Sequence, residues 1–461
     1  MTNLDMIVNV LDYGAIPDGN ALNTKAVQSA IDSCAKQGGG RVVFSKGRYV
    51  LSTVFLKSNV EIVIEKDAVI LGSLDFYHYA AQEKIDYPLY QDASHSYFDC
   101  SMFVGKNCEN IAIYGEGIID MRSVWDEDNV RDMVNRGAKC IALKECKNVQ
   151  IHGIEIYNVT DLAIYFAGCE YVDIHHLKMR VYIDGISPDN SSKVNIHDCD
   201  IETGDDGIVF KSSYTLNRLG VCEDITVKKC KVKSRCSAIK FGTETNGGFK
   251  NIYIEDIDIR ETRITGIAIE SVDGAVIDNI TIKNVTMRNV GAPLFIHLGN
   301  RMRGPNELEV GKIQNIWLEN LYAEGPYEPY ECIEWRYSSF VQKDVVQYPW
   351  QMEVGLQDYG IPFTCNVCGL REKALRNITL KNVKFVTQGG ISEYERELPD
   401  IANIVDYYPE VNVYGCTLPA SGIYFQYIDG LYLENVEIET YLPDARDALV
   451  FDSVTNLVRE G

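Results

Sequence analysis

Apolar and polar residues alternate in short runs along most of the chain. Each run reads approximately Asn-Ile-x-Ile-x-(Gly/Asn/Asp)-x-x-Ile, and its alternation and its richness in Val and Ile predict a β-strand. Asn, Asp and Gly between the runs supply turns. The runs begin at Asn110, Asn148, Tyr171, Lys193, Asp224, Asn251, Asn279, Asn315, Asn377 and Leu431. Because helical periodicity is almost missing, the pattern favours an all-β protein.

The tight spacings between these runs are about 22 to 28 residues, a period typical of solenoids. One coil of a solenoid cannot bury its apolar face by itself, whereas stacked coils can. A leucine-rich repeat would need a Leu-x-x-Leu-x-Leu frame, which the chain lacks, and a β-propeller would need a longer period. The sequence therefore predicts a parallel β-solenoid.

One segment near the N-terminus has the pattern of a helix. Asn23 can cap its start, and the glycines at 38–40 end it. Its apolar face consists of Ala26, Val27, Ala30 and Ile31. Since the open end of a solenoid must be covered, we expect this helix to belong to an N-terminal cap within about residues 1–50.

The chain contains no linker rich in Pro, Gly or Ser, so we expect a single domain over residues 1–461. Irregular spacing predicts long loops inserted at about 326–370 and 390–420. These loops carry much of the aromatic content, including Trp335, Tyr337, Tyr348 and Trp350. Aromatic side chains there could stack on the faces of sugars or pack the loops onto the solenoid.

The net charge of −22 narrows the choice of partners. An acidic surface argues against binding to nucleic acid and to anionic membranes. It also gives no long-range attraction for a polyanionic polymer. An acidic substrate would therefore have to be held by local cations.

The 14 cysteines are scattered, and many lie in strand-like runs, such as Cys199, Cys222 and Cys230. This distribution indicates reduced, buried thiols and no disulfide framework. Cys365 and Cys368 form a closer pair, but the partners that a metal or redox site would need are not evident. We expect neither a metal nor a cofactor.

The sequence also bears on location. Residues 1–8 have neither the basic region nor the long apolar stretch of a signal peptide, and no apolar run is long enough to span a bilayer. We therefore expect a cytoplasmic protein, or a secreted one if a signal has been removed.

Three aspartates lie about one solenoid coil apart: Asp184 in the stretch 182–185, and Asp205 and Asp206 in the stretch 203–207. Like charges held close together destabilise one another and raise a pKa, so this grouping stabilises a fold poorly. It suits a proton donor beside a base that activates water. A solvated Gly-Asp-Asp-Gly turn is an alternative, and so is a calcium site, although nearby lysines count against calcium.

Stacking of the coils predicts which residues surround these aspartates, because neighbouring strands of a sheet lie about 4.8 Å apart. Alignment of the coils predicts one column of Asp184, Asp206, Ser237 and Thr265. The next predicted columns contain Ser187, Val209, Lys240 and Ala268, and then Asp189, Lys211, Gly242 and Glu270. The expected site is a patch of carboxylates and lysines on rigid strands.

At these residues the chain resembles the polygalacturonase family of glycoside hydrolases, family 28. Residues 8–19 and 38–49 also resemble the start of the pectin-acting β-helix enzymes. The resemblance extends over most of the chain and implies a right-handed parallel β-helix. It implies that Asp205 is the general acid, while Asp184 and Asp206 hold and deprotonate the attacking water. This is a single displacement with inversion, which needs acid and base carboxylates about 6.5–9.5 Å apart. The pKa of Asp205 should then be raised by its neighbours.

Three motifs depart from the family pattern. The family's Asn-Thr-Asp is Tyr182-Ile183-Asp184 here, its Gly-His-Gly is Cys236-Ser237-Ala238, and its Arg-Ile-Lys is Ala268-Ile269-Glu270. The last motif is the family's cationic grip on a galacturonate carboxylate. We expect its loss to weaken the binding of acidic sugars, and an anionic Glu270 to repel them, although Lys240 could restore one positive charge.

Further residues are candidates around this site. Arg301 and Arg303 follow a strand and could reach over the site or lie in a solvated turn. Glu244 could contact substrate or cap a turn, and His297 could be a packed polar residue or a catalytic one. Tyr408, Pro409, Glu410 and Tyr424 could line a cleft. The expected substrate-binding residues are Tyr182, Lys211, Ser237, Lys240, Glu244, Glu270, Arg301 and Arg303.

The sequence thus favours an inverting glycosidase that acts on pectin-derived or related cell-wall oligosaccharides, exo-acting, with a specificity shifted from plain galacturonan. Its partner would be an oligosaccharide or polysaccharide. A polysaccharide lyase or epimerase on the same scaffold and a non-catalytic sugar-binding β-helix are the alternatives.

Overall fold

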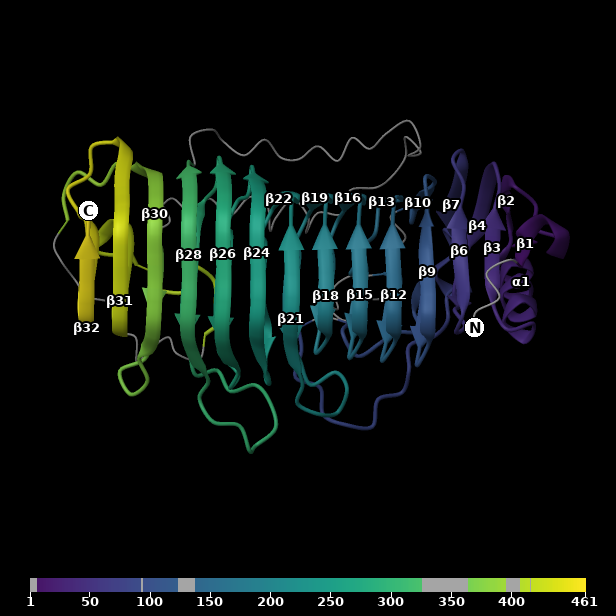
Figure 1. Cartoon of the computed structure of the whole chain (residues 1–461), viewed down its shortest axis with the longest axis horizontal. Helices are drawn as coiled ribbons and strands as arrows, with labels where there is room; N and C mark the ends of the chain where they lie inside the picture. Colours follow the sequence, from purple (N-terminus) through teal and green to yellow (C-terminus); the bar gives the residue numbers. More distant parts are fainter. Residues whose placement is uncertain (1–5, 93, 123–136, 326–363, 395–406, 415) are drawn as a thin grey trace. The chain divides into compact units, whose positions relative to one another are not determined.

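The computed structural model describes residues 6–92, 94–122, 137–325, 364–394, 407–414 and 416–461 (Figure 1). Within these ranges strands dominate, with one α-helix, α1 (Thr24–Lys36), and two short 3-10 helices, η1 (Val10–Tyr13) and η2 (Phe76–His78). The described residues fall into two compact units. The first contains residues up to Thr203 together with Thr215–Arg218, and the second contains Gly204–Tyr214 and the described residues from Leu219 onward.

The first unit is a stack of coils in which each strand pairs in parallel with its counterpart in the next coil. The first ladder is β1 (Ile7–Asn9), β3 (Gly40–Phe44), β6 (Val60–Ile64), β9 (Glu109–Gly115), β12 (Lys147–His152), β15 (Glu170–His175) and β18 (Ser192–His197). The second is β2 (Asp18–Leu22), β4 (Gly47–Leu51), β7 (Ala68–Gly72), β10 (Ile118–Asp120), β13 (Glu155–Tyr157), β16 (Lys178–Val181) and β19 (Asp200–Thr203). The third is β5 (Val54–Phe55), β8 (Ser101–Lys106), β11 (Lys139–Lys144), β14 (Ile164–Ala167) and β17 (Ile186–Asp189).

The second unit is also a stack of coils with parallel pairing, and the structure arranges its strands in two ladders. One ladder is β20 (Ile208–Ser212), β23 (Ser237–Thr245), β25 (Thr265–Ser271), β27 (Ala292–Leu298) and β29 (Cys365–Cys368). The other begins with β21 (Val221–Lys228) and β22 (Lys231–Ser234), which both pair with β24 (Gly248–Arg260), and continues through β26 (Val276–Arg288), β28 (Lys312–Glu324), β30 (Leu375–Gly389), β31 (Ala420–Leu442) and β32 (Asp447–Glu460). The second of these ladders contains long strands, such as β24, β26 and β28, which lie side by side in Figure 1. The parallel ladders confirm the all-β solenoid, and a single domain over the whole chain stays a prediction.

The repeat in the sequence corresponds to a corner in the backbone. Its first residue adopts a left-handed conformation in nearly every copy, with φ of 53° at Asn251 and 60° at Asn279. Asn tolerates this conformation better than other residues with a side chain, which explains its recurrence. The asparagines also stack: Asn279 Nδ2 donates to Asn251 Oδ1 at 2.8 Å, and Asn251 Nδ2 donates to Asp224 Oδ1 at 3.0 Å. In the last copy Gly430, with φ of 85°, takes this conformation immediately before Leu431.

The apolar residues of the repeat stack in the interior of each unit. In the second unit Ile252 pairs with Ile280, Ile280 with Ile316, and Ile316 with Ile378, and all four are buried. Burying one such side chain contributes about 1.5–3 kcal/mol. Each coil therefore buries its apolar face only against its neighbours, as the repeat predicts.

Helix α1 lies where the sequence predicts a capping helix, and Val27, Ala30, Ile31 and Cys34 form its buried face. The prediction that the Asn23 side chain caps this helix is wrong. Asn23 precedes the helix, but its side chain makes no capping bond. It binds the loop instead, because Asn23 Oδ1 accepts from the Ile16 N–H at 2.6 Å and Nδ2 donates to Ile16 O at 3.1 Å. After the helix, a Cβ at Gly39 would lie 2.2 Å from Asn59 O, so this close turn requires glycine.

Within the described residues every cysteine is a free thiol, and all are buried except Cys236 and Cys416. Burial raises the pKa of the thiols of Cys365 and Cys368, on β29, to about 12. These two residues are therefore packed, protonated thiols, as expected for most of the cysteines. No helix in the described ranges is long and apolar enough to cross a bilayer.

Much of the expected loop at about 326–370 lies outside the described residues, and so do its aromatic residues Trp335, Tyr337, Tyr348 and Trp350. The described part of this loop contains β29, which pairs with β27 and β31. In the expected loop at about 390–420, the described residues 407–414 include Tyr408 and Glu410. This segment contributes to the site below.

Candidate functional site

Asp205 and Asp206 lie immediately before β20 in the second unit. Asp205 is partly exposed, whereas Asp206 is buried. The Ser237 N–H donates to Asp206 Oδ1 at 3.1 Å, and the Gly207 N–H donates to Ser237 O at 2.9 Å. Ser234 Oγ donates to the main-chain oxygen of Asp205 at 2.6 Å. The next coil thus holds both aspartates in place through its backbone and a hydroxyl group.

Lys240, on β23, is a cation that forms an ion pair with Asp206. Its side chain is only 2% exposed, and its ammonium group lies 3.5 Å from Asp206 Oδ2 and 2.9 Å from Glu410 Oε1. Burial opposes the charge, but the carboxylates of Asp206 and Glu410 outweigh it and raise the pKa of Lys240 well above its ordinary value. Lys240 is therefore a permanent positive charge whose hydrogen-bonding capacity is shared between two carboxylates.

Glu270, on β25, and His297, on β27, are register partners in adjacent coils. Both side chains are buried, and neither finds a hydrogen-bond partner among the described residues. Burial raises the pKa of Glu270 well above its ordinary value, with Lys240 opposing and Glu410 adding to the shift. Burial also lowers the pKa of His297 to about 4. His297 is therefore uncharged at neutral pH, and burial favours the protonated form of Glu270.

Burial of Glu270 bears on one expectation from the sequence. An anionic Glu270 would repel an acidic sugar, whereas burial favours the protonated carboxyl, so the expected repulsion stays a prediction. His297 stacks on Phe295 with ring centroids 5.4 Å apart. The sequence left His297 as either a packed polar residue or a catalytic one. Its buried, stacked ring has the surroundings of a packed residue.

A second group of charges consists of Lys211 on β20, Glu244 on β23 and Arg303, which follows β27. Lys211 Nζ is 3.2 Å from Glu244 Oε2, and an Arg303 terminal nitrogen is 3.4 Å from Glu244 Oε1. Lys211 and Glu244 are almost completely buried, whereas the Arg303 side chain is 26% exposed. Glu244 is thus a buried carboxylate that forms ion pairs with both Lys211 and Arg303. Each of these three residues was predicted from the sequence as a substrate contact.

Arg301 extends this group through a bidentate pair with Asp273. Its Nε donates to Asp273 Oδ1 at 2.9 Å, and a terminal nitrogen donates to Asp273 Oδ2 at 2.5 Å. The same nitrogen donates to Thr243 O at 2.8 Å. The ring of Tyr408 lies 5.9 Å from both the Arg301 guanidinium and the Lys240 ammonium group, within reach of a cation–π contact. Residues 408–410 therefore pack over both cations.

The predicted columns are confirmed in part. Ser237 pairs with Thr265, Val209 with Lys240, and Lys240 with Ala268. Beyond Phe210 and Phe241 the register shifts, so that Ser212 pairs with Thr245. In the third predicted column, Lys211 Nζ reaches the carbonyl of Gly242 at 3.3 Å, but the register shifts at this point and Lys211 forms its ion pair with Glu244. A Cβ at Gly242 would lie 2.8 Å from a carboxyl oxygen of Glu270, so Gly242 and Glu270 are neighbours as predicted.

The other predicted site residues belong to the first unit. Asp184 and Tyr182 lie between β16 and β17, and both are buried. The Ala163 N–H donates to Asp184 O at 3.0 Å, and the Tyr182 N–H donates to Val159 O at 2.9 Å. How Asp184 faces Asp205 and Asp206 stays a prediction.

Two carboxylates of the site, Asp273 and Glu410, were not among the catalytic or substrate-binding residues predicted from the sequence. Asp273 follows β25 in an Asp-Gly turn, a pattern too common to single out. Glu410 was anticipated only as part of a loop lining a cleft, and no local pattern links it to Lys240. Tyr424, expected beside that loop, is instead a fully buried strand residue whose hydroxyl group lies 3.2 Å from Asp452.

The fold and the site define a class: a parallel β-helix with adjacent aspartates just before a strand and a buried lysine next to them on the neighbouring strand. Residues 60–324 match the model of glycosyl hydrolases family 28, and the chain belongs to this family. The match contains Asp184, Asp205, Asp206 and Lys240, whereas Glu410 lies outside it.

Known proteins agree with this assignment. The chain is 26% identical over 267 residues to a probable polygalacturonase of Vitis vinifera, covering 54% of each chain. It is 25% identical over 260 residues to the exo-poly-alpha-D-galacturonosidase of Dickeya chrysanthemi, covering 45% of this chain and 42% of the relative. The chain thus spans about half the length of these curated relatives. Among solved structures, the family 28 exopolygalacturonase of Yersinia enterocolitica has a TM-score of 0.67 at 19% identity, covering 98% of this chain and 78% of the other. These neighbours confirm the right-handed parallel β-helix.

Proposed function

We propose that the protein is an inverting glycoside hydrolase that removes terminal residues from pectin-derived oligosaccharides and favours a neutral sugar or a modified uronide over plain galacturonate. Membership of family 28 supports the glycosidase activity. The exo mode rests on the similarity to the exo-poly-alpha-D-galacturonosidase of Dickeya chrysanthemi. The shifted specificity rests on the surroundings of Lys240.

The proposed reaction is a single displacement. Asp205 gives its proton to the oxygen of the leaving sugar as the glycosidic C–O bond breaks. A water molecule held by Asp184 and Asp206 attacks the anomeric carbon from the opposite face and passes a proton to these carboxylates. The Ser237 N–H and the Lys240 ammonium group support an anionic Asp206, as a base requires. The partial exposure of Asp205 suits an acid that must reach the substrate.

One observation carries the specificity: the cations of the site already face carboxylates. Lys240 pairs with Asp206 and Glu410, Lys211 with Glu244, and Arg301 with Asp273. A galacturonate carboxylate would have to compete with these buried partners for the same cations, and the anionic Glu410 would oppose it. A neutral sugar meets neither penalty.

A proton NMR time course with a mixture of neutral-terminated and galacturonate-terminated pectic oligosaccharides tests the proposal. Wild type should release sugar with inverted anomeric configuration, neutral sugar first, and Asp205→Asn should lower the rate by about 10²–10⁴-fold. Asp447→Asn, at an exposed position of β32, is the matched control and should retain the rate. Vinylic signals would identify a lyase instead, and preferred release of galacturonate would contradict the specificity.

A further inference from the structure

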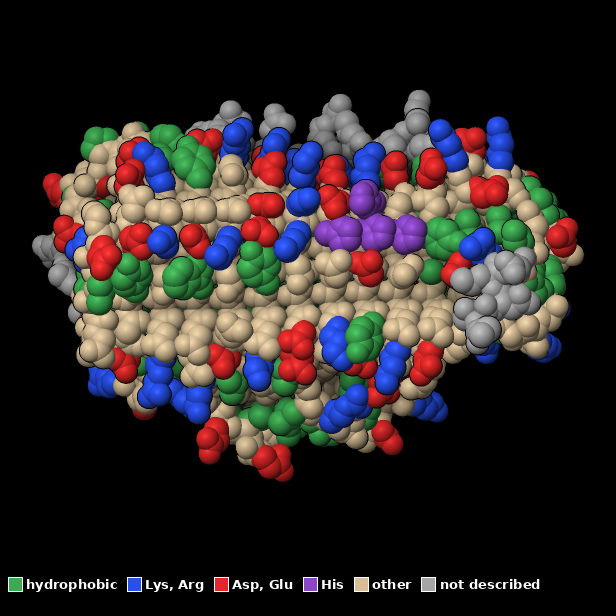
Figure 2. Space-filling model, viewed as in Figure 1, with side chains coloured by type: hydrophobic (Ala, Val, Ile, Leu, Met, Phe, Trp, Pro, Cys, Tyr) green, Lys and Arg blue, Asp and Glu red, His purple; other side chains and the backbone are tan. Residues whose placement is uncertain are grey.

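A row of histidines follows the first ladder of the first unit. Tyr114, His152, His175 and His197 occupy the same register position of β9, β12, β15 and β18. Their rings stack, with centroids 4.9, 4.6 and 4.8 Å apart in turn. Figure 2 shows the histidine side chains as one continuous row on this face. With His176, the row holds four of the chain's seven histidines.

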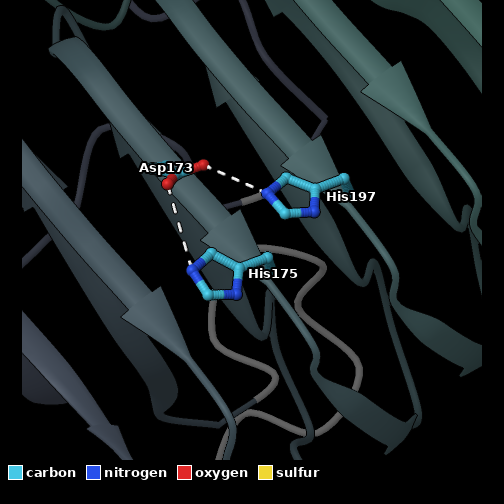
Figure 3. A group of neighbouring side chains, drawn as sticks. All are labelled: Asp173, His175 and His197. Atoms are coloured by element: carbon cyan, nitrogen blue, oxygen red, sulfur yellow. Dashed lines mark ion pairs between the residues drawn. The ribbon is translucent and has the colours of Figure 1, made fainter.

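Asp173 lies beside this row, at the register position of Gln150 and Asn195. It stands two residues before His175 on β15, so both side chains project from the same face of the strand. Asp173 Oδ2 is 3.9 Å from His175 Nε2, and Asp173 Oδ1 is 3.6 Å from His197 Nε2 (Figure 3). One ligand atom from each of the three side chains lies within 4.8 Å of the others.

The second nitrogen of each ring is already engaged. His197 Nδ1 lies 2.7 Å from Asp198 Oδ2, and His175 Nδ1 lies 2.9 Å from His176 Nδ1. A ring that donates from Nδ1 carries its lone pair on Nε2, the atom that faces Asp173 in both histidines. Asp173 Oδ1 in turn accepts from Asn195 Nδ2 at 2.9 Å. Outer partners of this kind orient histidine and carboxylate ligands in metal sites.

We propose that Asp173, His175 and His197 form a binding site for a divalent transition-metal ion such as Zn²⁺. Two imidazole nitrogens and one carboxylate oxygen are the ligands of zinc sites, whereas calcium and magnesium prefer oxygen ligands only. Ligand atoms bound tetrahedrally to zinc lie about 3.4 Å apart. The rings of His175 and His197 stack with their planes 13° apart, so binding requires the rings to turn out of the stack until both Nε2 atoms face one ion.

The site is partly open, because the three side chains are 24 to 39% exposed. Solvent can therefore supply the remaining ligand to the ion. The strands that carry the site form the first ladder, whereas Asp184 follows β16 of the second ladder. The inference adds a site that the proposed hydrolysis does not use.

Calorimetric titration of metal-free, tag-free protein with Zn²⁺ tests the site, with Co²⁺ as a spectroscopic probe. Wild type should bind one equivalent of Zn²⁺, and bound Co²⁺ should show the intense visible absorption of a low-coordinate site. His175→Gln, His197→Gln and Asp173→Asn should each weaken binding by at least about tenfold. Circular dichroism of each variant verifies that it has folded.

His152→Gln is the matched control. Its ring stacks on His175 at 4.6 Å but belongs to no ligand set, so binding should change less than about twofold. No binding by wild type would overturn the proposal, and so would binding retained when His175 and His197 are both replaced. A loss that follows His176→Gln and spares His175→Gln would move the ion to the neighbouring group of His176, His197 and Asp198, and would also overturn the assignment.

Discussion

Lys240 and Glu410 are 170 residues apart in the chain, yet the lysine Nζ lies 2.9 Å from the glutamate Oε1. The same ammonium group lies 3.5 Å from Asp206 Oδ2. Lys240 lies within the part that matches family 28, whereas Glu410 comes from outside it. A residue outside the family match thus forms an ion pair with the lysine next to Asp206, one of the expected catalytic aspartates.

Replacing Glu410 tests this relationship. Glu410→Gln keeps the size of the side chain and removes a negative charge, so Lys240 becomes more available to a substrate carboxylate. We expect kcat/KM for galacturonate-terminated relative to neutral-terminated oligosaccharides to rise about tenfold, which corresponds to ~1.4 kcal/mol. Glu307→Gln, at an exposed position, should leave the ratio unchanged. An equal fall with both substrates would show that Glu410 only supports the structure.

Glu270 should make stability depend on pH. Its pKa is raised in the folded protein, so its stabilising contribution is complete below the ordinary value of 4.5 and is lost as the pH rises toward the folded pKa. Glu270→Gln removes this dependence. The free energy of unfolding of the variant minus that of wild type should therefore grow more positive from pH 4.5 upward. Chemical denaturation at several pH values measures the difference, and a difference independent of pH would contradict a buried neutral carboxyl.

His297 has the opposite dependence. The pKa of His297 is about 4 in the folded protein and rises to about 6.5 on unfolding. The contribution of the neutral imidazole to folding stability is therefore complete above pH 6.5 and is lost as the pH falls toward 4. The corresponding cost at pH 5, relative to pH 7, is about 2 kcal/mol. His297→Met should remove this cost, so the variant gains stability on wild type as the pH falls. Equal acid sensitivity of the two proteins would refute a buried neutral imidazole.

The asparagine corners allow a test of the fold with a matched pair of variants. Asn279 is exposed, has φ of 60° and donates to Asn251. Asn279→Ala loses this hydrogen bond, and alanine tolerates the left-handed conformation less well than asparagine does. Together these two effects should lower the free energy of unfolding by about 2 kcal/mol. Asn279→Gly loses the bond but permits the conformation, and should cost about half as much. Equal costs would show that the backbone conformation contributes nothing.

Part of the site could be predicted because it depends on the repeat. Aligning the coils by their Ile residues correctly places Val209 beside Lys240 and Lys240 beside Ala268. The alignment fails beyond Phe241, where the register shifts before Thr245. A repeat defines register only while each strand keeps one residue for each residue of its neighbour, and no sequence pattern marked the extra residues here.

The sequence by itself determined the elements that depend on local chemistry: alternating strands, turns at Asn, Asp and Gly, stacked aliphatic side chains and the adjacent Asp205 and Asp206. Only the tertiary structure decided which charges meet and which groups keep a proton. The pairing of Lys240 with Glu410 requires chain segments far apart in sequence to pack together. The raised pKa of Glu270 requires removal of the carboxyl from water, and burial is a property of the packed coils that no single repeat contains.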